Sequence, residues 1–193
     1  GDDILSALIH AEEDGDRLNE DELVSMVFLL IVAGFETTTS LISNSIITFN
    51  RHPDQLERLH NEPRLLGSAV EELLRYAGPI HGTKMNYARK DMELRGVHVP
   101  QGTAVMPLLG AANRDEAVFE DPDRFDIARD PNKHLSFSQG NHFCLGAFLA
   151  RMETKIALDT LYQRFDKIEL VEEPEVAPVP GWYRYRDYKV RPA

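Results

Sequence analysis

The single cysteine of the chain, Cys144, lies between a glycine-containing loop and an apolar segment. The loop begins at Phe137, and Gly140 within it allows a positive φ that a larger residue resists. The segment from Leu145 onward reads as the first turns of a helix, whose unpaired N–H groups and positive dipole end would point at the sulfur. A thiolate in this position can bind a metal and can serve as an axial ligand of haem iron. Taken alone, a lone cysteine is more often a small buried apolar residue, so its neighbours must decide.

Three other segments carry residues with a chemical pattern. Glu72 and Arg75 are three positions apart, which places an acid and a guanidinium on one helix face. Segment 119–125 supplies a further arginine, and segment 33–38 joins two small residues to an acid and two threonines. Together with Cys144 and the residues that follow it, these segments resemble four regions of the cytochrome P450 family, in the family's order. The resemblance is to soluble bacterial haem-thiolate monooxygenases.

The resemblance implies roles around haem b, iron protoporphyrin IX. Cys144 would be the iron ligand, with Phe137 shielding the sulfur, Gly140 forming the turn and Gly146 admitting close approach. His142 is similar to the residue that hydrogen-bonds a haem propionate. A loop histidine is otherwise usually a polar surface group.

On the other haem face, the resemblance assigns segment 33–38 to oxygen binding. Ala33 and Gly34 lack bulk, so dioxygen could lie against the helix backbone. Thr37 and Glu36 would be catalytic and would deliver protons from solvent. The alternative for Thr37 is a hydrogen bond back to a carbonyl one turn earlier, and for Glu36 an acid at the edge of an apolar stripe.

Glu72, Arg75 and Arg124 are predicted to form a structural triad. Each arginine offers a planar fork to the same carboxylate, so the triad could fix the loop that presents Cys144. An ordinary surface ion pair at these positions would contribute less than about 1 kcal/mol.

Substrate contacts are assigned by position alone, since apolar residues at such sites are more often simple core. The candidates are Leu29, Val32, Phe35, Ile80, His81 and Tyr183. They indicate a small molecule that is at least partly apolar.

Two departures from the family pattern concern haem retention. Ser138 stands where the family commonly has glycine, which could stiffen or shift the bend. Asn86 stands where an arginine usually pairs with a haem propionate, and Lys84, two residues earlier, would lie on the same side of a strand and could supply the charge.

Composition is consistent with a soluble cytoplasmic enzyme. The chain has 193 residues, 42% of them hydrophobic, and a net charge of −11. The negative charge argues against nucleic acid or an anionic membrane surface as the main partner. One cysteine excludes an intrachain disulfide framework and suits a reducing compartment. The acidic start does not resemble a secretory signal, and the apolar run 26–35 is too short to span a bilayer.

The elements that must position these residues are mainly helices with small β-sheets. Apolar spacing and breakers predict helices over 3–13, 21–50, 53–61, 63–76 and 145–165, and strands over 84–94, 97–99, 104–109 and within 168–190. In the resembled family this order forms the C-terminal half of the fold, including the long central oxygen-binding helix and the cysteine loop. We therefore expect residues 1–193 to be a single domain or a fragment, with the N-terminal half of the same fold as its partner.

The favoured function is a monooxygenase that uses dioxygen and two electrons to hydroxylate its substrate. The resemblance implies that electrons come from NAD(P)H through a ferredoxin or flavodoxin-type donor. The main alternative is a non-catalytic haem-binding or interaction module. A peroxide-driven oxygenase is disfavoured, because it would not need the Glu36 and Thr37 pair.

Overall fold

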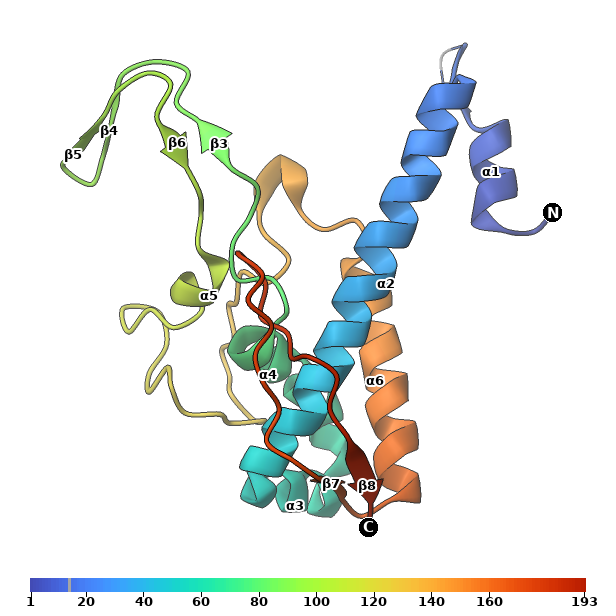
Figure 1. Cartoon of the computed structure of the whole chain (residues 1–193), viewed down its shortest axis with the longest axis vertical. Helices are drawn as coiled ribbons and strands as arrows, with labels where there is room; N and C mark the ends of the chain where they lie inside the picture. Colours follow the sequence, from blue (N-terminus) through green and yellow to red (C-terminus); the bar gives the residue numbers. More distant parts are fainter. Residues whose placement is uncertain (14) are drawn as a thin grey trace. The chain divides into compact units, whose positions relative to one another are not determined.

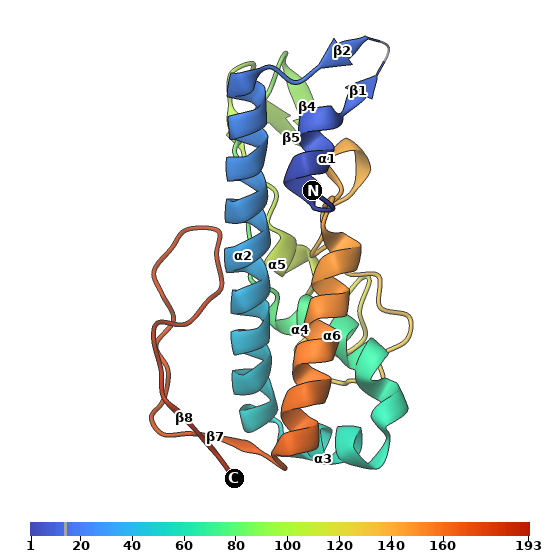
Figure 2. The same ribbon diagram turned by 90° about the vertical axis from the view of Figure 1, so that its right-hand side faces the viewer.

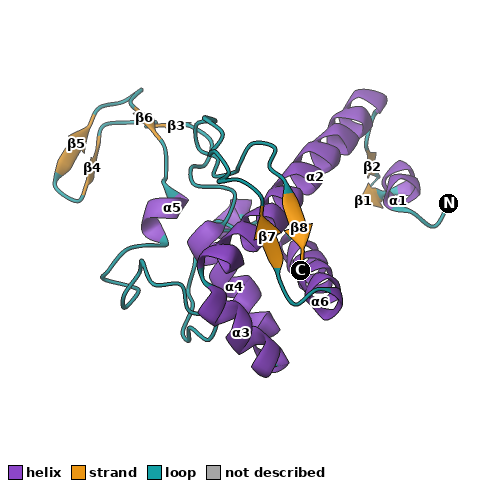
Figure 3. Ribbon diagram, turned by 60° about the horizontal axis from the view of Figure 1, so that its bottom comes forward, coloured by secondary structure: helices purple, strands orange, loops and turns teal. Residues whose placement is uncertain are grey.

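The computed structural model describes residues 1–13 and 15–193. They form two compact units, Gly1–Thr39 and Ser40–Ala193, and the helix α2 (Glu20–Arg51) contributes to both. Helices predominate and every described strand is short, as Figure 3 shows. The predicted class, mainly α with small β-sheets, is confirmed.

The first unit contains α1 (Ile4–His10), the antiparallel strands β1 (Glu12–Glu13) and β2 (Asp16–Arg17), and the beginning of α2. The helix predicted over 3–13 ends at His10, because Ala11 adopts an extended conformation. At the start of α2, Asn19 and Glu22 cap each other: the Asn19 N–H donates to the Glu22 carboxylate at 2.9 Å, and the Glu22 N–H donates to Asn19 Oδ1 at 3.0 Å.

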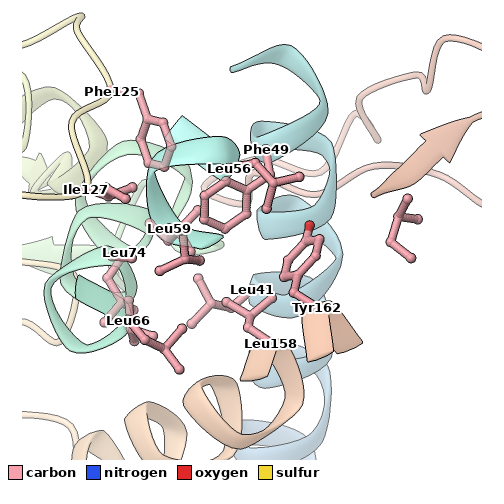
Figure 4. Close-up of a cluster of buried hydrophobic side chains, with 14 residues drawn as sticks. Leu41, Phe49, Leu56, Leu59, Leu66, Leu74, Phe125, Ile127, Leu158 and Tyr162 are labelled. Carbon is pink, nitrogen blue, oxygen red and sulfur yellow. The ribbon is translucent and has the colours of Figure 1, made fainter. Parts of the chain in front are cut away.

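The second unit is built around helices. They are the last part of α2, α3 (Pro53–Asn61), the short η1 (Pro63–Leu65), α4 (Leu66–Ala77) and α6 (Ala147–Arg164). Leu41 and Phe49 of α2 meet Leu158 and Tyr162 of α6 in the hydrophobic core, as Figure 4 shows. Figure 2 shows α6 running beside this part of α2. This core fixes α4 and α6, which contact each other, and α6 directly follows the cysteine loop in the sequence.

Strands of the second unit pair in antiparallel ribbons. They are β3 (Asn86–Tyr87) with β6 (Ala104–Val105), β4 (Met92–Leu94) with β5 (Val97–Val99), and β7 (Ile168–Leu170) with β8 (Val190–Pro192). Figure 1 shows β3 to β6 as an arm that leaves the helical core, followed by the short helix α5 (Leu109–Ala112). The strand predicted over 97–99 is confirmed as β5, whereas the other predicted strands are shorter than the apolar pattern suggested.

Helix α2 is apolar over most of its length, and only its C-terminal part is buried. Its buried residues lie between Ser40 and Phe49, whereas Phe28 and Phe35 are exposed. An 18-residue window of α2 reaches a mean hydropathy of 1.7, so the helix is long and apolar enough to cross a membrane, unlike the run 26–35 considered alone. The core helix of a soluble protein meets the same criterion, so this composition is weak evidence for a membrane span.

Candidate functional site

Cys144 lies between the one-turn helix η2 (Gly140–His142) and α6. Its backbone N–H donates to the carbonyl oxygen of Phe137 at 2.9 Å, which closes the loop into a turn. Gly140 has a φ of +77°, as the sequence predicted. Helix α6 begins at Ala147 with Gly146 as its N-cap, two residues later than expected. The loop presents a free, exposed thiol directly ahead of a helix N-terminus.

Ser138 has a φ of +62°, in the left-handed region that favours glycine. The loop thus keeps a glycine-like bend at this position although a side chain is present, and the Ser138 N–H donates to the Leu135 carbonyl at 2.8 Å. A non-glycine residue in this conformation costs about 1–2 kcal/mol.

We expect Ser138→Gly to raise the free energy of unfolding by about 0.5–1 kcal/mol, because relief of the left-handed strain exceeds the entropy cost of glycine. Urea unfolding measures the change. Gln139→Gly is the matched control, since the neighbouring residue has an extended φ of −154° and should lose stability. Equal effects of the two substitutions would contradict the strain at Ser138.

The residues around Cys144 fit a flat, apolar group that carries its own metal. Phe143, Leu145 and Phe148, close to Cys144 in the sequence, expose large apolar surfaces, and Leu145 is 89% exposed. A Cβ added at Gly146 would meet no atom within 4 Å, so the backbone there is open to a close neighbour. Nowhere in residues 1–13 and 15–193 do three His, Cys, Asp or Glu side chains gather as a metal site. Porphyrin supplies haem iron with most of its ligands, so a single thiolate is enough from this loop.

Glu72 and Arg75 of α4 form a buried ion pair. Both side chains are 0% exposed, and Arg75 Nε and Nη2 each donate to the Glu72 carboxylate at 2.8 Å. The remaining Arg75 donors reach three carbonyl oxygens, those of Asn113, Pro122 and Arg124, at 2.7–3.1 Å. The pair therefore ties α4 to the long segment that leads into the cysteine loop.

Arg124 was wrongly predicted as the third member of this cluster. Its guanidinium is 64% exposed and lies 3.9 Å from Asp126, while only its carbonyl oxygen contacts Arg75. Arg129 takes the predicted place: its Nε donates to Glu72 Oε1 at 3.2 Å, and its side chain is 11% exposed. The chain turns after residue 124, so Arg129 reaches inward and Arg124 faces solvent. Asn132 also donates to Glu72, at 3.0 Å.

The residues predicted to handle oxygen lie on α2 in the first unit. Ala33 and Gly34 are exposed, and no atom lies within 4 Å of a Cβ built at Gly34. Thr37 Oγ1 donates to the Ala33 carbonyl at 2.6 Å, which is the backbone hydrogen bond considered as its alternative. Glu36 is half-buried. These positions are compatible with the predicted roles, which stay predictions.

The residues assigned to haem propionates lie on exposed backbone. His142 is exposed in η2. Strand β3 begins at Asn86, so Lys84 lies outside it and the alternation argument for Lys84 does not hold. Asn86 Nδ2 donates to the Lys84 carbonyl at 3.0 Å. A role for Lys84 toward haem stays a prediction.

Three of the predicted substrate residues come together in the second unit. The His81 and Tyr183 rings stack with centroids 4.7 Å apart, and Ile80 forms a β-bridge with Trp182. Burial, together with the positive charge of Arg114, lowers the pKa of His81.

The other three predicted substrate residues, Leu29, Val32 and Phe35, are exposed on α2 in the first unit. Leu29 also lines a hollow of about 420 Å³ at the beginning of this helix.

Comparison with known proteins decides the family. The family model described as Cytochrome P450 matches residues 2–180. The chain belongs to the cytochrome P450 family. It is 49% identical over 175 residues to cytochrome P450 107B1 of Saccharopolyspora erythraea, a match that covers 91% of this chain and 43% of that protein. The chain thus spans less than half the length of this curated P450 relative.

Solved P450 structures confirm the predicted fold. CYP109E1 of Bacillus megaterium, in complex with testosterone, superposes with a TM-score of 0.94 at 40% identity, covering 100% of this chain and 54% of that one. P450BioI, solved with an acyl carrier protein carrying hexadec-9Z-enoic acid, gives 0.88 at 44% identity, covering 95% of this chain and 50% of that one.

The sequence did not predict the side chains that bind the two adjacent acids of α4, Glu71 and Glu72. Arg129 and Asn132 at Glu72, and His134 and Arg151 at Glu71, come from loop or helix positions without a local pattern. The one usable signal was the second acid, Glu71, directly beside Glu72 on α4. Two adjacent acids on a largely buried helix each require a cationic partner.

Proposed function

We propose that the chain is the haem-binding part of a monooxygenase that hydroxylates a small, at least partly apolar organic molecule. The observation that carries the proposal is the exposed thiol of Cys144, in a loop with two left-handed residues and beside apolar surface, in a P450 chain. When haem is bound, its thiolate-ligated iron would activate dioxygen, a reaction that consumes two electrons.

The chain's own residues would bind and orient the haem. Cys144 would be the iron ligand, and Phe137 would shield its sulfur from water. Gly140 and Gly146 would keep the loop backbone close to the ring, and His142 would hold a propionate. In support, the positive φ at Gly140 and the open space at Gly146 leave room for a flat group.

Glu36 and Thr37 would carry protons toward the reacting molecule. Glu36 exchanges protons with solvent, and the Thr37 hydroxyl holds the last proton of the relay at Oγ1. The hydrogen bond to the Ala33 carbonyl fixes the rotamer of Thr37, so the hydroxyl is ordered before it passes its proton. Ala33 and Gly34 would leave space for dioxygen beside the helix.

We expect Thr37→Ala to lower the amount of product formed per NAD(P)H consumed several-fold, because proton delivery becomes disordered. Thr39→Ala is the matched control: Thr39 makes the same bond one turn back, from Oγ1 to the Phe35 carbonyl at 2.8 Å. The measurement is product against NAD(P)H consumption. Coupling that is unchanged by Thr37→Ala, or reduced equally by Thr39→Ala, removes the assignment.

The partners follow from the same proposal. Electrons would come from NAD(P)H through a ferredoxin or flavodoxin-type donor in the cytoplasm. The N-terminal part of the same fold would be a further partner. Ile80, His81 and Tyr183 would contact the substrate, as would Leu29, Val32 and Phe35.

A non-catalytic haem-binding or interaction module is the second candidate. It is favoured by the changed loop, in which Ser138 stands where the family commonly has glycine. Two measurements on the protein expressed from its complete open reading frame separate the two candidates. The first is the carbon monoxide difference spectrum of the reduced protein, and the second is electron transfer after a ferredoxin and its reductase are added. The proposed function predicts a thiolate-type difference spectrum and electron transfer from NAD(P)H. A thiolate spectrum without electron transfer supports the module, and no thiolate spectrum contradicts the proposed function.

A further inference from the structure

A second charged cluster lies beside the buried Glu72 pair and reaches the cysteine loop from another side. Arg151 of α6 donates from Nε and Nη2 to the two carboxylate oxygens of Glu71, at 2.7 and 2.9 Å. His134, ahead of the loop, lies with Nε2 at 3.0 Å from Glu71 Oε2. Helix α4, helix α6 and the segment that precedes the cysteine loop therefore meet at one carboxylate.

Two contacts indicate which ring nitrogen of His134 donates. The backbone N–H of Ser136 donates to His134 Nδ1 at 3.2 Å, so Nδ1 is an acceptor and Nε2 carries the proton toward Glu71. The His134 side chain is 3% exposed. Its orientation is thus fixed from both ring nitrogens.

The Glu71 carboxylate stays charged in this setting. Burial opposes its ionisation, but the hydrogen bonds from His134 and Arg151 outweigh burial and hold the pKa of Glu71 at about 2. The bidentate geometry holds the Arg151 guanidinium in one plane.

That plane lies against Phe137. The central carbon of the Arg151 guanidinium is 4.4 Å from the centroid of the Phe137 ring, within the range of a cation–π contact. The His134 ring is 6.1 Å from the same ring. The Phe137 carbonyl in turn accepts the N–H of Cys144. A continuous path of contacts therefore runs from Glu71 through Arg151 and Phe137 to the backbone of the cysteine.

We propose that Glu71, Arg151 and His134 are positioning residues for Cys144, which act by clamping Phe137. The proposal rests on the proposed function for its consequence, a stable iron–thiolate bond, but the clamp itself is a property of the chain. Only arginine can supply the fork and the flat face together, so lysine at position 151 keeps the charge and loses the clamp.

The test is amide hydrogen exchange at Cys144 in the haem-free protein expressed from its complete open reading frame. Because a charge-assisted hydrogen-bonded contact is lost, we expect Arg151→Lys to speed exchange of the Cys144 amide about tenfold. The haem-loaded variant should also keep a smaller thiolate-type fraction in its carbon monoxide spectrum.

Arg114→Lys is the matched control. Arg114 pairs with Asp123, lies 4.5 Å from the centroid of the Tyr76 ring and is 33% exposed, against 35% for Arg151, but its ring contact is not with Phe137. The clamp predicts unchanged exchange at Cys144 in Arg114→Lys. Unchanged exchange in Arg151→Lys, or an equal rise in both variants, overturns it.

Phe137→Leu keeps the test decisive if Arg151→Lys does not fold. This variant leaves the Glu71 pair intact and removes the ring, so the clamp predicts a similar rise in exchange at Cys144. Adding Arg151→Lys to it should then change little, whereas additive effects contradict a path through Phe137. Amide exchange is measured in the haem-free protein, so it tests the clamp even if carbon monoxide spectra refute thiolate ligation. The clamp and the proposed function can therefore be refuted independently of each other.

Discussion

Replacing Arg75 with alanine is expected to lower the free energy of unfolding by about 3–5 kcal/mol, the cost of breaking a buried ion pair. The Glu72 carboxylate would lose two of its donors, and the carbonyls of Asn113 and Pro122 would lose their hydrogen bonds from Arg75. The Arg124 carbonyl would keep the hydrogen bond from Arg129 Nη2 at 3.0 Å. Arg129 and Asn132 would remain at Glu72 and cannot replace the fork. Urea unfolding of the two proteins measures the difference.

The control for this experiment is Arg64→Ala. Arg64 pairs with Glu62 at the surface, and its side chain is 80% exposed. Its removal should cost less than about 1 kcal/mol. Similar losses for the two substitutions would mean that the Glu72 cluster is not the anchor described here. Haem should also leave the Arg75→Ala protein faster, since the segment that carries the cysteine loop loses its attachment to α4.

Replacing Cys144 with serine is expected to abolish the thiolate-type spectrum of the carbon monoxide complex and to reduce turnover to background. Serine is nearly isosteric, so the loop and its hydrogen bond to Phe137 should persist. The change therefore isolates the sulfur. The comparison is made on protein expressed from its complete open reading frame and loaded with hemin.

Cys144→His serves as the companion variant. Imidazole can bind haem iron as a neutral ligand, so this variant should retain haem and lack the thiolate spectrum. Turnover in Cys144→Ser at the wild-type level would show that another group activates the iron.

Local patterns predicted what is local in this chain. The positive φ at Gly140, the pairing of Glu72 with Arg75 and the helix that follows Cys144 depend on neighbours within a few residues, and the structure contains all three. The limits of that helix were less accurate, because α6 begins at Ala147, two residues after its expected start, with Gly146 as its N-cap.

Contacts between distant segments could not be predicted in the same way. Arg124 and Arg129 are both arginines in one irregular segment, and only the path of the backbone decides which of them points at Glu72. The fork of Arg151 reaches Glu71 across 80 positions of sequence. For the same reason the length of each strand in the β3 to β6 arm depends on pairing partners and not on its own apolar pattern.

The proposed function depends on a bond between the sulfur of Cys144 and haem iron. X-ray absorption at the iron edge tests this bond most directly. The hemin-loaded protein should show one sulfur atom in the first coordination shell of iron, and Cys144→Ser should show none. A first shell of nitrogen and oxygen alone in the unsubstituted protein, or a sulfur that persists in Cys144→Ser, would contradict the claim.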